Sequence, residues 1–158
     1  MLALQGVART LEAGAAGCAA RVRVLDGVTL RLAPREFVAV TGGAACERSL
    51  LLLCAAGLAR VDAGVVAAQA RCRYVRGSEL GDRHTEPILL VDEADSLAAI
   101  RAIARALARG ATVLAAGADA GAFARAGARV LTLRDGALVE RAPAAPVRRE
   151  RVAERALR

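Results

Sequence analysis

The feature that most constrains the fold of this chain is the unbroken apolar run ILLV at residues 88–91, which ends in Asp92 and Glu93. A short apolar run without polar alternation is typical of a strand that is buried on both faces. A helical pattern with one apolar face follows at residues 96–109, and a second buried strand at 112–116. Because alternating strands and helices build parallel sheets, this order predicts an α/β domain with a mostly parallel central sheet.

The segments on either side extend the same pattern. Residues 36–41 predict a strand that ends at Gly42 and Gly43, and residues 49–58 predict a buried helix with Gly57 near its end. Residues 1–40 are interpreted as an antiparallel β layer attached to the sheet, with a turn at Asp26 and Gly27. The remaining predicted elements are a strand-like stretch at 65–75, a weak helix at 120–126, and a hairpin of 129–133 with 137–140.

Composition limits the size and the partners of the domain. A chain of 158 residues predicts a single domain with a core, but aromatic residues make up only 2% of it, so small side chains fill that core and we expect modest stability. The net charge is +7, and all the basic residues are Arg. This bias is explained by a GC-rich genome or, alternatively, by an anionic partner. Nucleic acid is not favoured, because no aromatic residues are interleaved for base stacking.

Cysteine spacing and hydropathy argue against several other classes. The four cysteines form no CxxC pair and His84 is the only histidine, so a metal site of the zinc type is not expected. No secretory leader opens the sequence, and the longest apolar run, at about ten residues, is too short to cross a bilayer. We therefore expect a cytoplasmic protein, either free or peripheral at the inner face of the cell membrane. The Arg-rich tail at 141–158 is interpreted as solvated or, alternatively, as a docking helix.

Seven segments, in this order, resemble the ATP-binding domain of ABC transporters. They are residues 24–32 (VLDGVTLRL), 34–41 (PREFVAVT), 42–49 (GGAACERS, the Walker A place), 57–64, 88–96 (ILLVDEADS, the Walker B place), 112–119 (TVLAAGAD) and 129–139 (RVLTLRDGALV). The resemblance runs from about residue 2 to residue 140, and it implies an ABC-type nucleotide-binding-like domain at 1–140. It implies a P-loop NTPase-like three-layer sandwich with a mostly parallel central sheet, plus an N-terminal antiparallel β layer.

The segment in the Walker A place departs from what a phosphate loop needs. The family's loop turns backbone N–H groups toward the phosphates, with a lysine on the β and γ phosphates and a hydroxyl on Mg²⁺. By this resemblance the nucleotide positions are Gly42, Gly43, Ala44, Ala45, Cys46, Glu47, Arg48, Ser49 and Leu50. Glu47 stands in place of the second glycine and Arg48 in place of the lysine. A carboxylate about 4 Å from a phosphate charge costs roughly 4 kcal/mol at an effective dielectric near 20. We expect Arg48 to pair with Glu47 instead.

The Walker B segment is better preserved. The resemblance implies that Asp92 supports Mg²⁺ together with Ser49, and that Glu93 is a vestigial catalytic residue that would position the attacking water. The alternative is that the two acids only cap the following helix, since carboxylates favour a helix N-terminus.

Other parts of the family's site are missing. The switch histidine aligns with Ala118, the aromatic that stacks on adenine aligns with Leu11, and the glutamine aligns near Gly77. No LSGGQ-like signature occurs. The helical subdomain that carries it is interpreted as missing between about 76 and 87.

Three hypotheses for function follow. The first is a degenerate ABC-type module with weak or absent ATP hydrolysis, which acts as a partner or regulatory subunit beside an intact ABC ATPase or a membrane permease. The second is a minimal active ATPase that binds ATP and Mg²⁺ through Arg48, Ser49, Asp92 and Glu93. The third is a remnant, or an unrelated α/β binding protein whose Arg-rich tail holds an anion.

Overall fold

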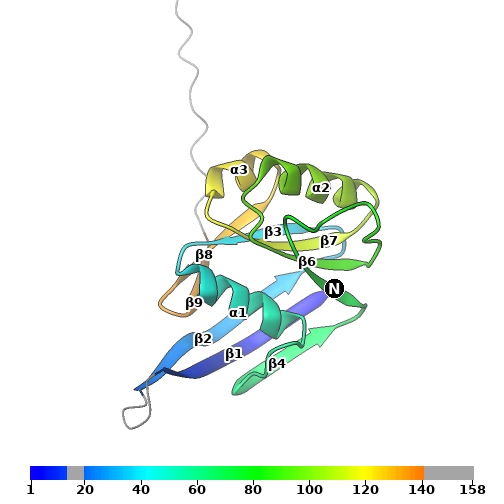
Figure 1. Cartoon of the computed structure of the whole chain (residues 1–158). Helices are drawn as coiled ribbons and strands as arrows, with labels where there is room; N and C mark the ends of the chain where they lie inside the picture. Colours follow the sequence, from blue (N-terminus) through cyan, green and yellow to red (C-terminus); the bar gives the residue numbers. More distant parts are fainter. Residues whose placement is uncertain (14–19, 141–158) are drawn as a thin grey trace, which may run out of the picture.

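The computed structural model describes residues 1–13 and 20–140, which form two sheets and three helices (Figure 1). The predicted Arg-rich tail at 141–158 lies outside the described residues. No helix in the described part of the chain is long and apolar enough to cross a membrane.

The central sheet has six strands in the order β5-β6-β7-β3-β8-β9. Its strands are β3 (Phe37–Thr41), β5 (Cys72–Arg76), β6 (Ile88–Asp92), β7 (Thr112–Ala116), β8 (Arg129–Arg134) and β9 (Ala137–Glu140). All neighbours pair in parallel except β8 and β9, which form the predicted hairpin around Asp135 and Gly136. Every residue of β3, β6 and β7 is buried, as the apolar runs predict for strands covered on both faces.

A second, antiparallel sheet has three strands in the order β2-β1-β4. It is built from β1 (Leu2–Ala13), β2 (Ala20–Leu32) and β4 (Ala63–Ala68). Along β2, the buried Val28, Leu30 and Leu32 alternate with the exposed Thr29 and Arg31. This alternation is typical of an antiparallel sheet with one buried face and one solvent-exposed face.

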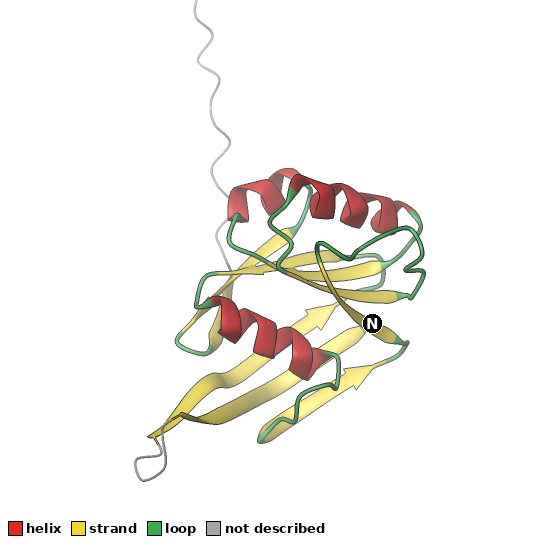
Figure 2. Cartoon of the chain, in the orientation of Figure 1, coloured by secondary structure: helices red, strands yellow, loops and turns green. Residues whose placement is uncertain are grey.

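The layers stack in a fixed order (Figures 1 and 2). The helix α1 (Ala45–Ala55) lies between the two sheets, and its Leu51, Leu52 and Cys54 pack with both. The helices α2 (Leu97–Ala108) and α3 (Ala120–Arg125) cover the other face of the central sheet. The predicted α/β sandwich with a mostly parallel sheet and an attached antiparallel layer is therefore confirmed.

Three details of the strand prediction are wrong. Residues 1–40 do not all belong to the antiparallel layer, because β3 lies in the middle of the central sheet. Asp26 and Gly27 do not reverse the chain: β2 continues through them, and Gly27, at φ +71°, lies at an irregularity of its pairing with β1. The stretch at 65–75 is two strands, because β4 pairs with β1 in one sheet and β5 pairs with β6 in the other.

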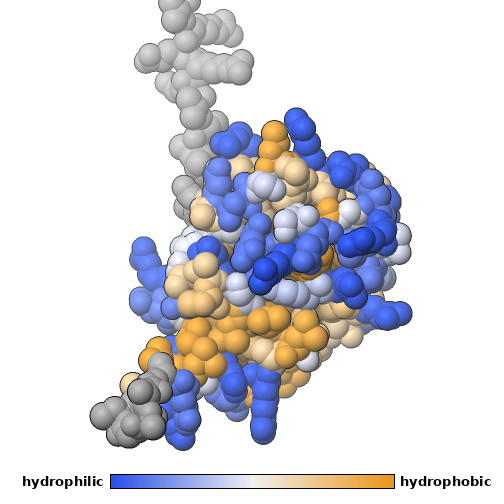
Figure 3. Space-filling view, viewed as in Figure 1, coloured by the Kyte–Doolittle hydropathy of each residue, from blue (hydrophilic) through white to orange (hydrophobic). Residues whose placement is uncertain are grey.

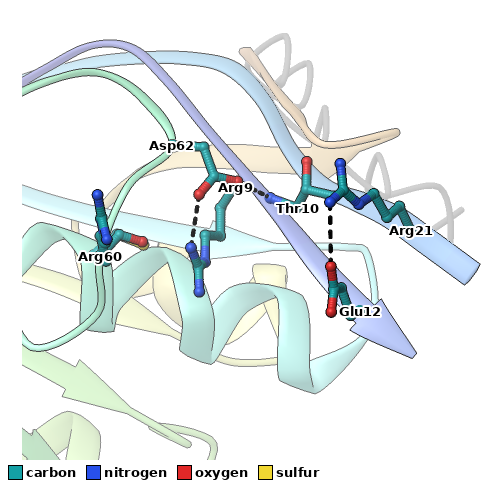
Figure 4. Close-up of polar contacts among 7 residues, drawn as sticks. Arg9, Thr10, Glu12, Arg21, Arg60 and Asp62 are labelled. Atoms are coloured by element: carbon teal, nitrogen blue, oxygen red, sulfur yellow. Dashed lines mark hydrogen bonds and ion pairs between the residues drawn. The ribbon is translucent and has the colours of Figure 1, made fainter. Parts of the chain in front are cut away.

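An ion pair at the surface fixes where β4 begins (Figure 4). Asp62 accepts hydrogen bonds from the Arg9 guanidinium and from the backbone N–H of Thr10, both at 2.7 Å. The Thr10 hydrogen bond, and after it the Arg9 contacts, lower the pKa of the Asp62 carboxyl. This contact ties the chain that leaves α1 to the middle of β1.

Apolar surface is unevenly distributed. Figure 3 shows it concentrated in the lower half of the view, where α1 and the antiparallel sheet lie. The most exposed large apolar side chains are Leu58 (66%), Leu97 (62%) and Val65 (59%).

Candidate functional site

The loops that follow β3, β6 and β7 meet at one edge of the central sheet. Because these strands are parallel, their carboxyl ends lie at the same edge, which is where α/β sheets bind ligands. Backbone hydrogen bonds join the three ends: Gly117 N–H donates to Val40 O at 3.2 Å, and Ala94 N–H donates to Ala116 O at 2.9 Å. The fold thus brings together the loops that follow residue 41, residue 92 and residue 116.

The loop after β3 begins with two glycines in the left-handed region. Gly42 has φ +73° and Gly43 has φ +56°, in the left-handed region that glycine tolerates best. A Cβ on Gly42 would lie 2.6 Å from Thr132 Cγ2 and 2.8 Å from Leu133 O. Glycine is therefore required at position 42 by packing as well as by conformation.

The Glu47 carboxylate is directed into this loop. Its Oε2 accepts a hydrogen bond from the backbone N–H of Ala44, the N-cap of α1, at 2.9 Å. The same oxygen lies 2.5 Å from the place where a Cβ on Gly43 would stand. One of the N–H groups that a helix N-terminus offers to an anion is therefore already bound to an anion of the chain itself.

Arg48 also turns back onto the loop. Its Nη1 donates to the carbonyl oxygens of Gly42, at 2.7 Å, and Gly43, at 2.9 Å. The predicted Arg48–Glu47 pair is wrong: among the described residues no ion pair joins these two side chains. The half-buried guanidinium of Arg48 thus has two carbonyl acceptors. These hydrogen bonds stabilise the loop.

The other predicted nucleotide positions line the start of α1. Ala44, Ala45 and Cys46 are exposed, and Ser49 and Leu50 are half-buried on the helix. The structure thus places all nine positions around one loop and one helix end.

Asp92, at the end of β6, is buried and hydrogen-bonded at both oxygens. It is 4% exposed. Its Oδ2 accepts from the Tyr74 hydroxyl at 2.7 Å, and its Oδ1 accepts from the Glu93 N–H at 2.9 Å. Tyr74 was missed in the sequence, because its place beside Asp92 follows only from the parallel pairing of β5 with β6.

The Tyr74 hydroxyl gives a testable pH dependence. Burial, and after it the hydrogen bond to Asp92, raise the pKa of Tyr74 to about 12. The folded state therefore holds this proton more tightly than the unfolded state, whose tyrosine has a pKa of about 10. The contribution is complete below about pH 10 and is lost as the pH rises to about 12.

We expect the free energy of unfolding of the wild type to fall relative to that of Tyr74→Phe between these two pH values. The measurement is denaturant unfolding of both proteins at a series of pH values. The chain has one Tyr and no Trp, so absorbance of the tyrosinate reports the same titration directly. A titration midpoint of Tyr74 near pH 10 in the folded protein would contradict the burial of its hydroxyl and its hydrogen bond to Asp92.

Glu93 does not cap the helix that follows it, contrary to what the alternative interpretation predicts. Glu93 is exposed, with φ +51°. The N-cap of α2 is Ser96, whose hydroxyl accepts from Ala99 N–H at 3.0 Å. The interpretation of Asp92 and Glu93 as helix caps is therefore wrong.

Asp95 is a second residue that the sequence did not single out. Its Oδ1 accepts from the backbone N–H groups of Ala118, at 2.5 Å, and Asp119, at 3.3 Å. Asp119 in turn caps α3 by accepting from Ala122 N–H. The loop at the position of the switch histidine is thus fixed from the Walker B side.

The remaining family positions carry other side chains in other surroundings. Gly77 is buried, and a Cβ there would lie 2.7 Å from Glu93 O, so no larger residue fits without a shift. Leu11 is 39% exposed. It lines a groove of about 770 Å³ with Arg9, Thr10, Glu12, Arg21, Arg23 and Asp62.

Comparison with known proteins gives a match in fold and none in sequence. No family model matches the chain, and no curated protein matches it. The ATP-binding cassette MJ0796, in a dimeric structure bound to ADP and phosphate, is similar with a TM-score of 0.71 and 17% identity, over 87% of this chain and 96% of that one. The chain has the fold of an ABC transporter ATP-binding cassette. Other cassettes agree with this assignment.

A further dimeric structure of MJ0796, described as a bacterial ABC transporter cassette, has a TM-score of 0.68 and 16% identity, over 87% of this chain and 96% of that one. The protein cbiO1 from Clostridium perfringens, part of the ABC transporter complex cbiONQ, has a TM-score of 0.64 and 9% identity, over 87% and 86%. In this chain's version of the cassette fold, residues 56–87 form β4 and β5 and contain no helix.

Proposed function

We propose that this chain is a cassette-type module that binds ATP weakly or not at all and serves as a partner or regulatory subunit. The proposal rests on a loop whose backbone groups are bound by the chain's own side chains, which we call the self-occupied loop. The Glu47 carboxylate accepts a hydrogen bond from the Ala44 N–H, and the Arg48 guanidinium donates to the carbonyls of Gly42 and Gly43. A bound phosphate would lie beside the Glu47 carboxylate, where the family has a glycine. No lysine ammonium would be available to bind it, because Arg48 stands at that position.

The residues present do not fit Mg-ATP as they stand. Both oxygens of Asp92 already accept hydrogen bonds, one from Tyr74 and one from the adjacent backbone. A magnesium ion at Asp92 would have to share these oxygens with the Tyr74 hydroxyl and the Glu93 N–H.

The proposed partner role rests on the fold around the loop and on the short stretch between α1 and β6. The fold keeps the cassette's layers, and the described stretch between α1 and β6 holds only two strands, where we place the lost helical subdomain and signature. Two copies of such a chain lack the parts for two complete nucleotide sites. We therefore place it beside an intact ABC ATPase or a permease, at the inner face of the cell membrane.

The alternative is a minimal active ATPase, and one observation favours it. Gly42 and Gly43 have left-handed backbone, and Ser49, Asp92 and Glu93 are the residues to which the resemblance assigns metal binding and hydrolysis. The alternative needs Glu47 and Arg48 to turn away when nucleotide arrives.

A thermal shift with Mg-ATP separates the two functions. A ligand at 100 times its dissociation constant stabilises a protein by about 2.7 kcal/mol, which raises the melting temperature of a domain this size by roughly 5–10 °C. We expect no shift at millimolar Mg-ATP. Titration of the chain into an intact cassette from the same cell then tests the partner role, with a changed ATPase rate as the expected result. A large shift, with hydrolysis by the chain alone, would establish the alternative.

A further inference from the structure

The loops after β6 and β7 are joined by a contact that lies outside the self-occupied loop. Asp95 lies between β6 and α2, and its carboxylate accepts hydrogen bonds from two consecutive backbone N–H groups of the loop after β7. Its Oδ1 lies 2.5 Å from the nitrogen of Ala118 and 3.3 Å from that of Asp119. Because β6 and β7 pair in parallel, both loops lie at the edge of the sheet that holds the candidate site.

The backbone on both sides of Asp95 is fixed, so its carboxylate is held in place without a ligand. The Ala94 N–H donates to the Ala116 carbonyl at 2.9 Å, and the Ser96 hydroxyl caps α2. Gly117 leaves room for the carboxylate, because a Cβ there would lie 2.6 Å from Asp95 Oδ1. The side chain therefore reaches the two amides across a bare stretch of backbone.

The two amides depend on this carboxylate. Ala118 and Asp119 are exposed, whereas residues 112–117 are buried. Within the described part of the chain, Asp95 is the acceptor for both of their N–H groups. Hydrogen bonds to an ionised acceptor are stronger than those between neutral groups. Removing the carboxylate would therefore leave the start of this loop without the bonds that order it.

The loop after β3 is ordered in the same way. There the Glu47 carboxylate accepts from the Ala44 N–H, and Arg48 donates to two carbonyls of the loop. Loops that bind ligands are usually among the least stable parts of a protein, and binding orders them. In this chain, side chains make contacts with the backbone of both loops in the absence of a ligand.

We infer that Asp95 is a latch that keeps the loop at 117–119 in one ordered conformation without nucleotide. The edge of the central sheet then presents the same surface whether or not ATP is present. This inference rests on the proposed function and deepens it, because a partner subunit with such an edge associates without being gated by ATP.

Amide exchange in nucleotide-free protein tests the Asp95 latch. The Ala118 and Asp119 amides should exchange about tenfold faster in Asp95→Ala than in the wild type, because the variant lacks the acceptor. Asp95→Asn keeps a neutral acceptor oxygen and should restore part of the protection. Asp26→Ala removes an exposed carboxylate of β2 and is the matched control, in which both rates should stay unchanged. The Leu114 amide, in the buried β7, should remain slow in every variant and shows that the sheet is folded.

Mg-ATP separates the latch from the proposed function. Millimolar Mg-ATP should leave the exchange rates of the two amides unchanged in the wild type. If Mg-ATP raises the melting temperature while the amides are already protected without it, the proposed function fails and the latch stands. If the amides of the nucleotide-free wild type exchange as fast as those of Asp95→Ala, the latch is overturned, whether or not ATP binds.

Discussion

The double variant Glu47→Gly, Arg48→Lys is expected to bind Mg-ATP about a thousandfold more tightly than the wild type. Removing the carboxylate removes a repulsion of roughly 4 kcal/mol at about 4 Å and an effective dielectric near 20, which corresponds to about three decades in affinity. It also frees the Ala44 N–H, which Glu47 now occupies at 2.9 Å. Lysine restores a slim ammonium in place of a guanidinium held by two carbonyls. Isothermal titration with Mg-ATP measures the change.

The single variants divide this effect between its causes. Glu47→Gln keeps an acceptor for Ala44 N–H but loses the charge, so it reports the electrostatic part alone. Arg48→Lys alone should gain little, because the carboxylate still stands in the loop. Arg101→Lys, on the exposed face of α2, is a control that should leave nucleotide affinity unchanged. If the double variant binds no better than the wild type, Glu47 and Arg48 are not what closes the loop.

Phe123→Ala is expected to cost about 3–5 kcal/mol of the free energy of unfolding, the usual range for a buried phenylalanine. Phe123 is 0% exposed and packs edge-on against Phe37, with ring centroids 6.3 Å apart. These are the only two phenylalanines of the chain, and they lie together in the core beneath α2 and α3. A loss of this size is a large share of the 5–15 kcal/mol by which domains are stable. Urea unfolding measures it.

Phe123→Ala should also disturb the loop of the candidate site that carries Ala118. A Cβ on Gly117 would lie 2.8 Å from Phe123 Cζ and 2.6 Å from Asp95 Oδ1, so the ring supports the loop that carries Ala118. Leu58→Ala is the matched control, because Leu58 is 66% exposed and its truncation should cost less than about 0.5 kcal/mol. A loss below 1 kcal/mol for Phe123→Ala would show that this core is loosely packed.

The sequence predicts three inner strands of the central sheet well, because β3, β6 and β7 are short apolar runs that are buried. The runs at β3, β6 and β7 needed no tertiary information, and the glycines at 42, 43 and 136 marked turns correctly. The antiparallel layer was harder. Gly27 indicates a turn in isolation, but β2 continues past it and pairs with β1 on both sides of an irregularity. The division of residues 65–75 into two sheets depends on partners far away in the chain.

The contacts of the candidate site could not be predicted from the sequence. Glu47 and Arg48 lie in the first turn of α1, and their adjacency in sequence suggested that they would pair. Successive residues on a helix point in different directions, so Glu47 reaches the N-cap while Arg48 reaches the loop carbonyls. Tyr74 and Asp95 act across strands and loops that no local pattern connects.

The most direct test of the self-occupied loop is a crystal structure of the wild-type protein grown with Mg-ATP. We predict the Glu47 carboxylate on the Ala44 N–H, the Arg48 guanidinium on the carbonyls of Gly42 and Gly43, and no ordered phosphates. A triphosphate enclosed by the backbone of residues 43–49, with magnesium on the Ser49 hydroxyl, would contradict the account.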